Sequence, residues 1–204
     1  MKRFKKVIAA VLTAVIAASL LAGCGGSGDG TDKRIVRIGH NQSSTHPTHI
    51  GLTAFEEYIE ENLGDKYDVE VYPSELLGSQ TDMVQLTQTG AIDFCVASNA
   101  ILETFSKNYE IFNLPYLFVN AEAYHAVMDD TSITDQLFKS TEKAGFEAVT
   151  WLDAGTRNFY TVDTPIESPA DLKGLKIRVQ QSPTNVEMMR LLGGSANPMG
   201  FGDV

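Results

Sequence analysis

Two arginines, Arg157 and Arg178, are the side chains of this sequence whose chemistry best suits a small anion. Arg157 lies in a loop-like run at 154–158, and Arg178 lies in a short alternating segment that polar residues follow. A guanidinium group binds a carboxylate through two parallel hydrogen bonds, and each charge-assisted bond contributes about 1.5–3 kcal/mol. The alternative is that both arginines pair with surface acids, which contributes about 0–1 kcal/mol. The residues alone therefore predict an anion pocket, and surface ion pairs are the competing interpretation.

Polar side chains follow three predicted strands at their carboxyl ends, where open α/β sheets bind their ligands. They are His40 and Asn41, Ser98 and Asn99, and Gln180 and Gln181 beside Arg178. We therefore expect polar loops to supply hydrogen bonds around the anion pocket.

Three histidines lie within ten residues, at His40, His46 and His49. Imidazole suits zinc, copper and nickel, so a metal-binding surface protein is the alternative function. The segment has no paired His-x-x-x-His, no cysteine partner and no carboxylate cluster at ligand spacing. Pro47 would also break a helix that aligned His46 with His49. We therefore expect loop histidines with local hydrogen bonds, and no metal site.

No nucleophile and base stand together in a catalytic pattern. Ser195 lies among glycines but lacks the Gly-x-Ser-x-Gly spacing of a nucleophile elbow. The glycine-rich run 23–30 lacks the lysine and the strand–helix context of a phosphate loop. The sequence therefore predicts neither an enzyme nor a cofactor.

The charge of the chain excludes another class of partner. Its 204 residues include 26 acidic and 16 basic ones, a formal net charge of −10, and four of the basic residues lie within the first six positions. Nucleic acid binding needs a basic face, which this balance does not offer. At 43% hydrophobic and 21% charged residues, the composition is that of a globular protein.

Strand-like and helix-like segments alternate along the chain, which indicates an α/β fold. We expect strands at 35–39, 67–72, 91–97, 146–152 and 175–179, and helices at 53–62, 81–89, 121–128, 134–144 and 183–192. Ser168 and Asp171 cap a single helical turn between them. Cys95 lies inside an apolar run and is predicted to be a buried core thiol.

The first residues have the pattern of a targeting signal. A basic start and a 16-residue apolar run, shorter than the ~20 residues of a spanning helix, predict a secretory signal at 1–23, with an uncleaved membrane anchor as the alternative. Residues 21–24 resemble the lipobox of bacterial lipoproteins, in which Cys24 would be the lipidated first residue. Residues 24–33 then form a flexible Gly/Ser tether. We expect a lipid-anchored protein outside the cytoplasmic membrane.

Beyond this leader, the sequence resembles the extracytoplasmic solute receptors of TRAP (tripartite ATP-independent periplasmic) transporters, the DctP family. The resemblance runs in order through the blocks 76–78, 90–93, 114–118, 155–159, 171–179, 197–199 and 203–204. Each block is short, but their common order and spacing make chance agreement improbable.

The resemblance implies a periplasmic-binding-protein-like fold in which two α/β domains close over a small organic acid, a sugar acid or a dicarboxylate. The bound acid would then pass to the membrane permease. We expect the first domain at 34–153 and the start of the second at 154–204. Such receptors continue well beyond the position of Val204, so we expect a C-terminally truncated chain whose second domain is incomplete.

The resemblance also implies roles for the polar residues. Arg178 corresponds to the carboxylate clamp of the family, and Arg157 assists it. Ligand-binding positions follow at Asn41, Ser98, Asn99, Gln180, Gln181 and His46. The combination of Ser98-Asn99 with His46-Pro47 is more similar to the sugar-acid receptors than to the sialate receptors. Closure of the domains would bury the ion pair and strengthen it.

Overall fold

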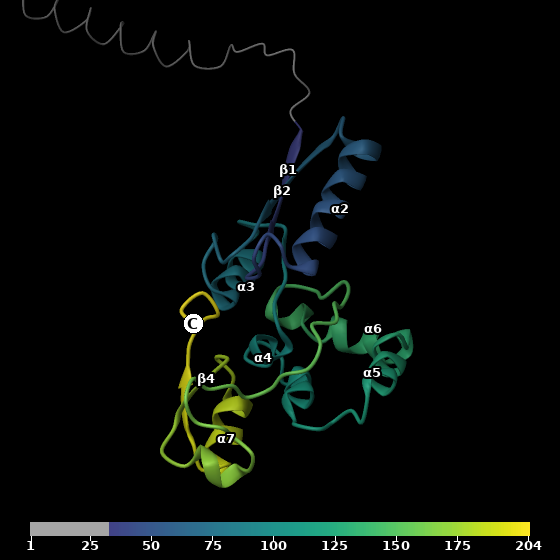
Figure 1. Ribbon diagram of the computed structural model, residues 1–204. Coiled ribbons are helices and arrows are strands. Elements are labelled where there is room, and N and C mark those ends of the chain that lie inside the picture. The colour runs from purple at the N-terminus through teal and green to yellow at the C-terminus, as the bar shows by residue number, and fades with distance from the viewer. Residues whose placement is uncertain (1–32) are drawn as a thin grey trace, which may run out of the picture. The chain divides into compact units, whose positions relative to one another are not determined.

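The computed structural model describes residues 33–204 (Figure 1). The predicted signal at 1–23, the lipidated Cys24 and all but the last residue of the tether lie outside the described residues. Within residues 33–204, no helix combines the length and the apolar character that crossing a membrane requires.

The first half of the described chain forms a parallel three-stranded sheet in the order β2-β1-β3. The strands are β1 (Arg34–Gly39), β2 (Tyr67–Tyr72) and β3 (Phe94–Cys95), and β1 pairs in register from Arg34↔Tyr67 to Gly39↔Tyr72. Helix α2 (Pro47–Leu63) connects β1 to β2, and α3 (Gln80–Thr89) connects β2 to β3. All three strands therefore end at the same edge of the sheet, as βα repeats require.

Helix α3 shows how local sequence sets these elements. Ser79 and Asp82 form a capping box, in which the Ser79 N–H donates to the Asp82 carboxylate at 2.9 Å. Gly90 ends the helix in the left-handed region at φ 72°, as glycine does at little cost. Met83 and Val84 are buried against the sheet side of the core. The predicted helix at 81–89 is therefore confirmed, with its start one residue earlier.

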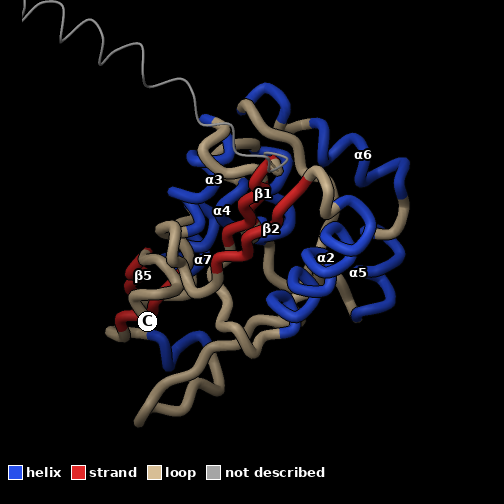
Figure 2. The backbone as a smooth tube through the Cα atoms, turned by 90° about the horizontal axis from the view of Figure 1, so that it is seen from above, coloured by secondary structure: helices blue, strands red, loops and turns tan. Residues whose placement is uncertain are grey.

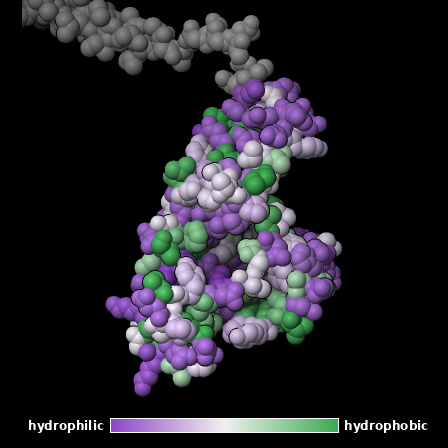
Figure 3. Space-filling view, viewed as in Figure 1, coloured by the Kyte–Doolittle hydropathy of each residue, from purple (hydrophilic) through white to green (hydrophobic). Residues whose placement is uncertain are grey.

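The middle of the chain is helical. It comprises α4 (Asn99–Leu102), the 3-10 helix η1 (Lys107–Asn113), α5 (Ala121–Met128), α6 (Thr131–Lys139) and the 3-10 turn η2 (Glu142–Ala144). Asn120 caps α5 and Asp130 caps α6, and the two helices lie side by side in Figures 1 and 2. Hydrophobic residues gather on the face shown in Figure 3 near the segment that leads into α5.

The last part of the chain builds a second, smaller parallel sheet. Strands β4 (Lys176–Val179) and β5 (Ser195–Pro198) pair in parallel, with α7 (Pro183–Leu191) between them and the 3-10 turn η3 (Pro169–Leu172) before them. The side chains of Leu172, Val179 and Met189 form its buried core. The alternation of apolar and polar residues in β4 places one face on that core, as the sequence predicted. The α/β fold class is confirmed.

Two strands expected from the sequence differ in the structure: one is shorter, and the other does not form. The strand expected at 91–97 shrinks to Phe94–Cys95, because the Asp93 carboxylate takes the backbone N–H of Arg37 at 2.9 Å in place of a ladder carbonyl. The strand expected at 146–152 does not form, and Val149 and Leu152 remain exposed. A strand needs a neighbouring strand for its hydrogen bonds, and no described strand lies beside this segment.

Three smaller expectations also change. The helix expected at 134–144 is two elements, because α6 ends at Lys139 and a separate turn follows. The helix expected at 53–62 begins at Pro47, since proline suits the first turn and His46 caps it. Cys95 is partly exposed and not fully buried, although burial still raises the pKa of its thiol.

Candidate functional site

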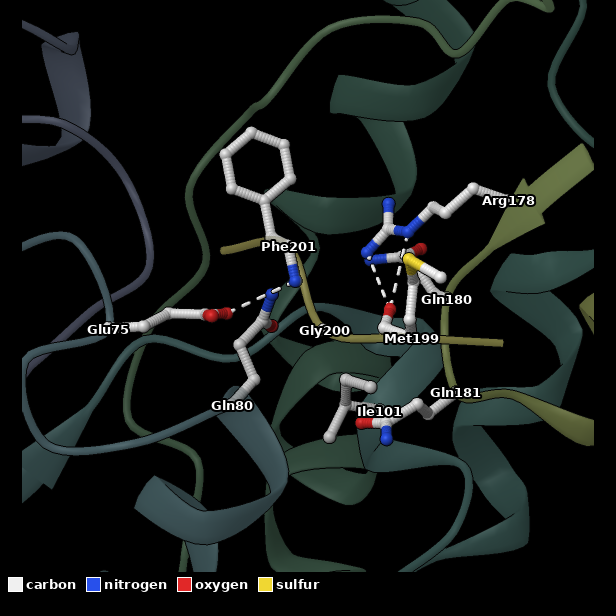
Figure 4. A pocket seen from close by; sticks show the side chains of 9 residues that line it. All are labelled: Glu75, Gln80, Ile101, Arg178, Gln180, Gln181, Met199, Gly200 and Phe201. Carbon is white, nitrogen blue, oxygen red and sulfur yellow. Dashed lines mark hydrogen bonds between the residues drawn. The ribbon is translucent and has the colours of Figure 1, made fainter. Parts of the chain in front are cut away.

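Three of the predicted ligand-binding residues, Arg178, Gln180 and Gln181, line one small cavity (Figure 4). Its other lining residues are Glu75, Gln80, Ile101, Met199, Gly200 and Phe201. The cavity volume is about 10 Å³, close to what one water molecule occupies. Its walls come from both sheets of the chain, because Glu75 and Gln80 follow β2 whereas Arg178 and Met199 belong to the β4–β5 unit.

The guanidinium group of Arg178 is held from one side. Its Nε and Nη2 atoms donate to the carbonyl oxygen of Met199 at 3.2 and 2.9 Å, and its Cζ lies 5.9 Å from the centroid of the Phe201 ring. Two of the five N–H groups are therefore occupied, and three make no hydrogen bond within residues 33–204. The β4 backbone and the Met199 carbonyl thus fix the orientation of a cation that can still bind an anion.

Five arginines lie in the described part of the chain, and they divide into two groups. Arg34, Arg37 and Arg190 form ion pairs with Asp93, Glu70 and Glu187, at 2.7, 3.4 and 2.5 Å. Arg157 and Arg178 form no ion pair with any described acid. The competing interpretation, that both predicted arginines pair with surface acids, is therefore wrong for residues 33–204.

The charge of one unpaired arginine, Arg178, acts on the other, Arg157. Loss of water through burial lowers the pKa of Arg178, while the charges of Tyr160 and Glu75 raise it. Loss of water also lowers the pKa of Arg157, although its side chain reaches the surface, and the charge of Arg178 lowers it further. Both groups remain charged at neutral pH. The charge of Arg178 reaches Arg157, and neither cation pairs with a described acid, so an anion would relieve the positive potential there.

A chain of polar contacts extends from this site to the first sheet. Gln180 Nε2 donates to Ser98 Oγ at 2.8 Å, and the Ser98 backbone N–H donates to Gln80 Oε1 at 2.6 Å. Thr81 Oγ1 donates to Gln181 Oε1 at 3.4 Å. The remaining amide oxygen of Gln180 is buried and has no partner among the described residues. A buried acceptor without a partner is unfavourable, so a donor from a ligand would stabilise this arrangement.

Five predicted site residues do not line this cavity, and one of them is Ser98, which contacts the lining residues Gln80 and Gln180. Asn41 is buried and accepts from Gln42 Nε2 at 3.3 Å, and Asn99 opens α4. His46 uses its Nδ1 to cap α2. Arg157 lies in an exposed loop and is connected to Arg178 only through the pKa effect described above.

The histidine cluster is an internal hydrogen-bond network. His40 is fully buried, accepts from the Gln42 backbone N–H at 3.2 Å, and lies 3.0 Å from His49 Nδ1 through its Nε2. Both ring nitrogens of His40 are therefore in use, as is Nδ1 of His46. Across residues 33–204, no three His, Cys, Asp or Glu side chains group in a way that could hold a metal ion. The metal-binding alternative is not supported.

Four further residues that line the cavity were not predicted from the sequence: Glu75, Gln80, Met199 and Phe201. Glu75 and Gln80 follow the carboxyl end of β2, so the rule that identified the ends of β1, β3 and β4 would have found them. Met199 and Phe201 follow β5, whose short Ser-Ala-Asn-Pro run carries little strand signal.

Comparison with known protein families gives one clear match. The family model described as "Bacterial extracellular solute-binding protein, family 7" (DctP) matches residues 38–204, which is most of the chain.

Individual proteins agree with this match. A TRAP periplasmic solute-binding protein of Anaerococcus prevotii, solved with bound D-glucuronate, is 73% identical with a TM-score of 0.83, over 84% of this chain and 56% of that one. One from Xanthobacter autotrophicus, solved with β-D-galacturonate, is 33% identical with a TM-score of 0.78, over 82% and 56%. An uncharacterized protein of Salmonella typhimurium, YiiZ, is 38% identical over 83% of this chain and 52% of its own length. The chain thus spans about half the length of these relatives.

Proposed function

Since the chain belongs to family 7 of the bacterial extracellular solute-binding proteins, the DctP family, we propose that it is a TRAP transporter receptor for a sugar acid. Members of this family are solute receptors and not enzymes. Uronic acids such as D-glucuronate are the first candidates, because the 73% identical Anaerococcus protein was solved with that ligand. Four-carbon dicarboxylates are the alternative ligands within the same class.

The single observation that carries this proposal is the pair of arginines without an acid partner. A sugar acid presents one carboxylate and several hydroxyl groups. Arg178 keeps three N–H groups for the carboxylate, while the unpaired Gln180 oxygen is buried and would need a side-chain rotation to accept from a hydroxyl group. The cavity is partly open but too small for a sugar, so the ligand would lie against the free side of the guanidinium and not in the cavity itself.

Each residue then has a role. Arg178 binds the carboxylate, Arg157 reaches it from the loop, and Ser98, Gln180 and Gln181 bind hydroxyl groups. Asn41, Asn99 and His46 are secondary candidates, because they do not line the cavity and their side chains make no hydrogen bond to a residue that lines it. Closure of the protein around the ligand removes water from the ion pair and strengthens it.

Delivery is the second half of the proposal. The bound acid passes to the membrane subunits of the transporter, and a lipid on Cys24, following removal of residues 1–23, keeps the receptor close to them. A tether of Gly and Ser at 24–33 would let the receptor reach the permease while anchored.

A ligand screen on the complete gene product tests the proposal. Thermal unfolding is measured with D-glucuronate, D-galacturonate, an aldonate, sialate and a four-carbon dicarboxylate, with D-glucose as the neutral control. A ligand at a hundred times its dissociation constant stabilises a fold by about 2.7 kcal/mol, which is a shift of several degrees. We expect the uronates to shift the midpoint most and glucose not at all. A shift with zinc and none with any acid would overturn the proposal.

A further inference from the structure

Glu75 connects the first sheet to the segment that holds Arg178. It lies in the loop between β2 and α3, and its carboxylate accepts the backbone N–H of Phe201 at 3.3 Å and that of Gly202 at 2.8 Å. These partners lie more than 120 residues further along the chain. Glu75 forms no ion pair with a described basic residue, so backbone amides are its partners in residues 33–204.

The backbone around Glu75 is held in an uncommon conformation. Ser74 and Glu75 both lie in the left-handed region, at φ 55° and 57°, which L-residues rarely adopt. The Glu75 N–H donates to the His40 carbonyl at 3.1 Å, and the Gly78 N–H donates to the Glu75 carbonyl at 2.9 Å. Such conformations persist where the surrounding contacts fix them, and they gather at functional sites.

Gly202 is shaped to receive the carboxylate. A Cβ atom built on Gly202 would lie 2.6 Å from Glu75 Oε2, closer than real Cβ contacts. An alanine at this position would therefore force the flexible end of the Glu75 side chain to shift away from the N–H group of residue 202.

The held segment is the one that orients Arg178. Met199 supplies the carbonyl that accepts from two guanidinium nitrogens, and Phe201 supplies the ring beside the guanidinium. Figure 4 shows Glu75 and Arg178 approaching the Met199–Phe201 segment from opposite sides. The Glu75 amide contacts fix the backbone at residues 201 and 202, immediately beyond the residues that touch Arg178. Movement of that backbone would release the guanidinium from its present orientation.

We propose that Glu75 is a positioning residue for Arg178, which holds the Met199–Gly202 backbone so that the guanidinium presents its free N–H groups to the carboxylate of a sugar acid. This inference rests on the proposed function, because it explains how the anion site is kept ready. The hydrogen bonds from the N–H groups of Phe201 and Gly202 also direct the Glu75 carboxylate toward the backbone. Glu75 therefore forms no ion pair with Arg178 and does not compete with the ligand.

Calorimetry with D-glucuronate on the complete gene product tests this role. We expect Glu75→Ala to weaken binding about tenfold, as coupled neighbouring residues typically do. Glu75→Gln should lose less affinity than Glu75→Ala, because its single amide oxygen can still accept one of the two N–H groups, which the carboxylate binds with separate oxygens. Gly202→Ala should weaken binding less than Glu75→Ala does, since the new methyl group displaces the carboxylate but the flexible Glu75 side chain can adjust. Glu61→Ala, at an exposed position of α2, is the matched control and should change nothing.

The same substitution made in an Arg178→Lys protein separates a positioning role of Glu75 from a general effect on stability. In an Arg178→Lys protein the two-pronged contact with Met199 is absent, so adding Glu75→Ala should cause almost no further loss of affinity. An equal loss in both backgrounds, or an unchanged affinity of the Glu75→Ala protein, would overturn the inference. If the parent binds no sugar acid at all, the proposed function fails instead, and the two failures are thereby distinguished.

Discussion

Arg178 and Arg157 carry the same charged group in two different settings. Arg178 stands on β4, above the buried Val179 and Leu172, with its guanidinium bound to the Met199 carbonyl. Arg157 stands in an exposed loop, and its side chain makes no hydrogen bond within residues 33–204. What is held near Arg157 is the backbone, because Asp153 accepts the Gly155 N–H at 2.7 Å.

This difference teaches how the free energy of binding divides between the two cations. A group already fixed in its binding orientation loses little conformational freedom when a ligand arrives, whereas an exposed side chain loses about 0.5–1.5 kcal/mol of it. We therefore expect Arg178 to provide most of the carboxylate binding and Arg157 to provide a smaller, adaptable part. The following predictions test that division.

Removal of Arg178 should have the largest effect. Arg178→Ala deletes two charge-assisted bonds of about 1.5–3 kcal/mol each, so we expect D-glucuronate affinity to fall by about a hundredfold to ten-thousandfold. Isothermal titration calorimetry measures the change. Arg190→Ala is the control, because Arg190 pairs with Glu187 on the exposed side of α7 and should leave affinity unchanged. An unchanged affinity in Arg178→Ala would show that the clamp lies elsewhere.

Removal of Arg157 should have a smaller effect of the same kind. We expect Arg157→Ala to weaken D-glucuronate binding about tenfold, the equivalent of one charge-assisted bond on a mobile side chain. The same calorimetric titration gives the value. If Arg157→Ala lost more affinity than Arg178→Ala, the proposed division between a fixed and an adaptable cation would be reversed.

Loss of the hydrogen bonds that support the Arg157 loop should weaken ligand binding less than loss of either arginine. Asp153 accepts from the Gly155 N–H and from His125 Nε2 at 3.1 Å, and these hydrogen bonds lower the pKa of its carboxyl group. We expect Asp153→Ala to free the loop and weaken binding about three- to fivefold, within the range of coupling between neighbours. Asp163→Ala, at an exposed position nearby in the sequence, serves as the control. Added to Arg157→Ala, the Asp153 substitution should cost no further affinity, and an additive loss would contradict the explanation.

Lowering the pH should reduce the stability of the fold without changing the charge of the two arginines. Burial, then the charges of His49 and His46, lower the pKa of His40 to about 4. Between the ordinary His pKa of about 6.5 and pH 4 the unfolded chain binds a proton that the folded chain does not, so stability falls as the pH is lowered.

Thermal melts across this range measure the effect. The groups that face His40 are His49 and His46, with Glu56 close to His49. We expect the unfolding midpoint to fall by several degrees between pH 7 and pH 5, and His40→Asn to flatten that dependence. The arginines stay charged throughout, so a parallel fall in the intrinsic affinity for D-glucuronate would contradict the separation of the two effects.

The elements that local sequence controls could be predicted. Strand β2 follows from the alternation of Val69 and Val71, and α3 follows from the Ser79 cap and the Gly90 stop, since each signal acts within a few residues. The segment at 146–152 shows the limit of this approach. Its apolar residues permit a strand, but only a neighbouring strand can supply the hydrogen bonds, and local sequence does not specify that neighbour.

The candidate site likewise has one part that local sequence predicts and one part that it does not. The grouping of Arg178, Gln180 and Gln181 could be predicted from their position around a strand end, and the structure brings them together in one cavity. The role we assign to Glu75 depends on Phe201 and Gly202, which lie far away in the sequence, and on a left-handed backbone that glutamate rarely adopts. No spacing rule connects such partners, so only the folded chain reveals them.

The central claim, that a carboxylate is bound at Arg178, is tested most directly by changing the ligand and not the protein. D-glucuronate and D-glucuronamide share every ring hydroxyl group, and only the first is an anion. Calorimetric titration of the unaltered complete gene product should give an affinity for the amide at least about a hundredfold weaker, because the guanidinium loses its charged partner. Equal affinities for the two compounds would contradict the account.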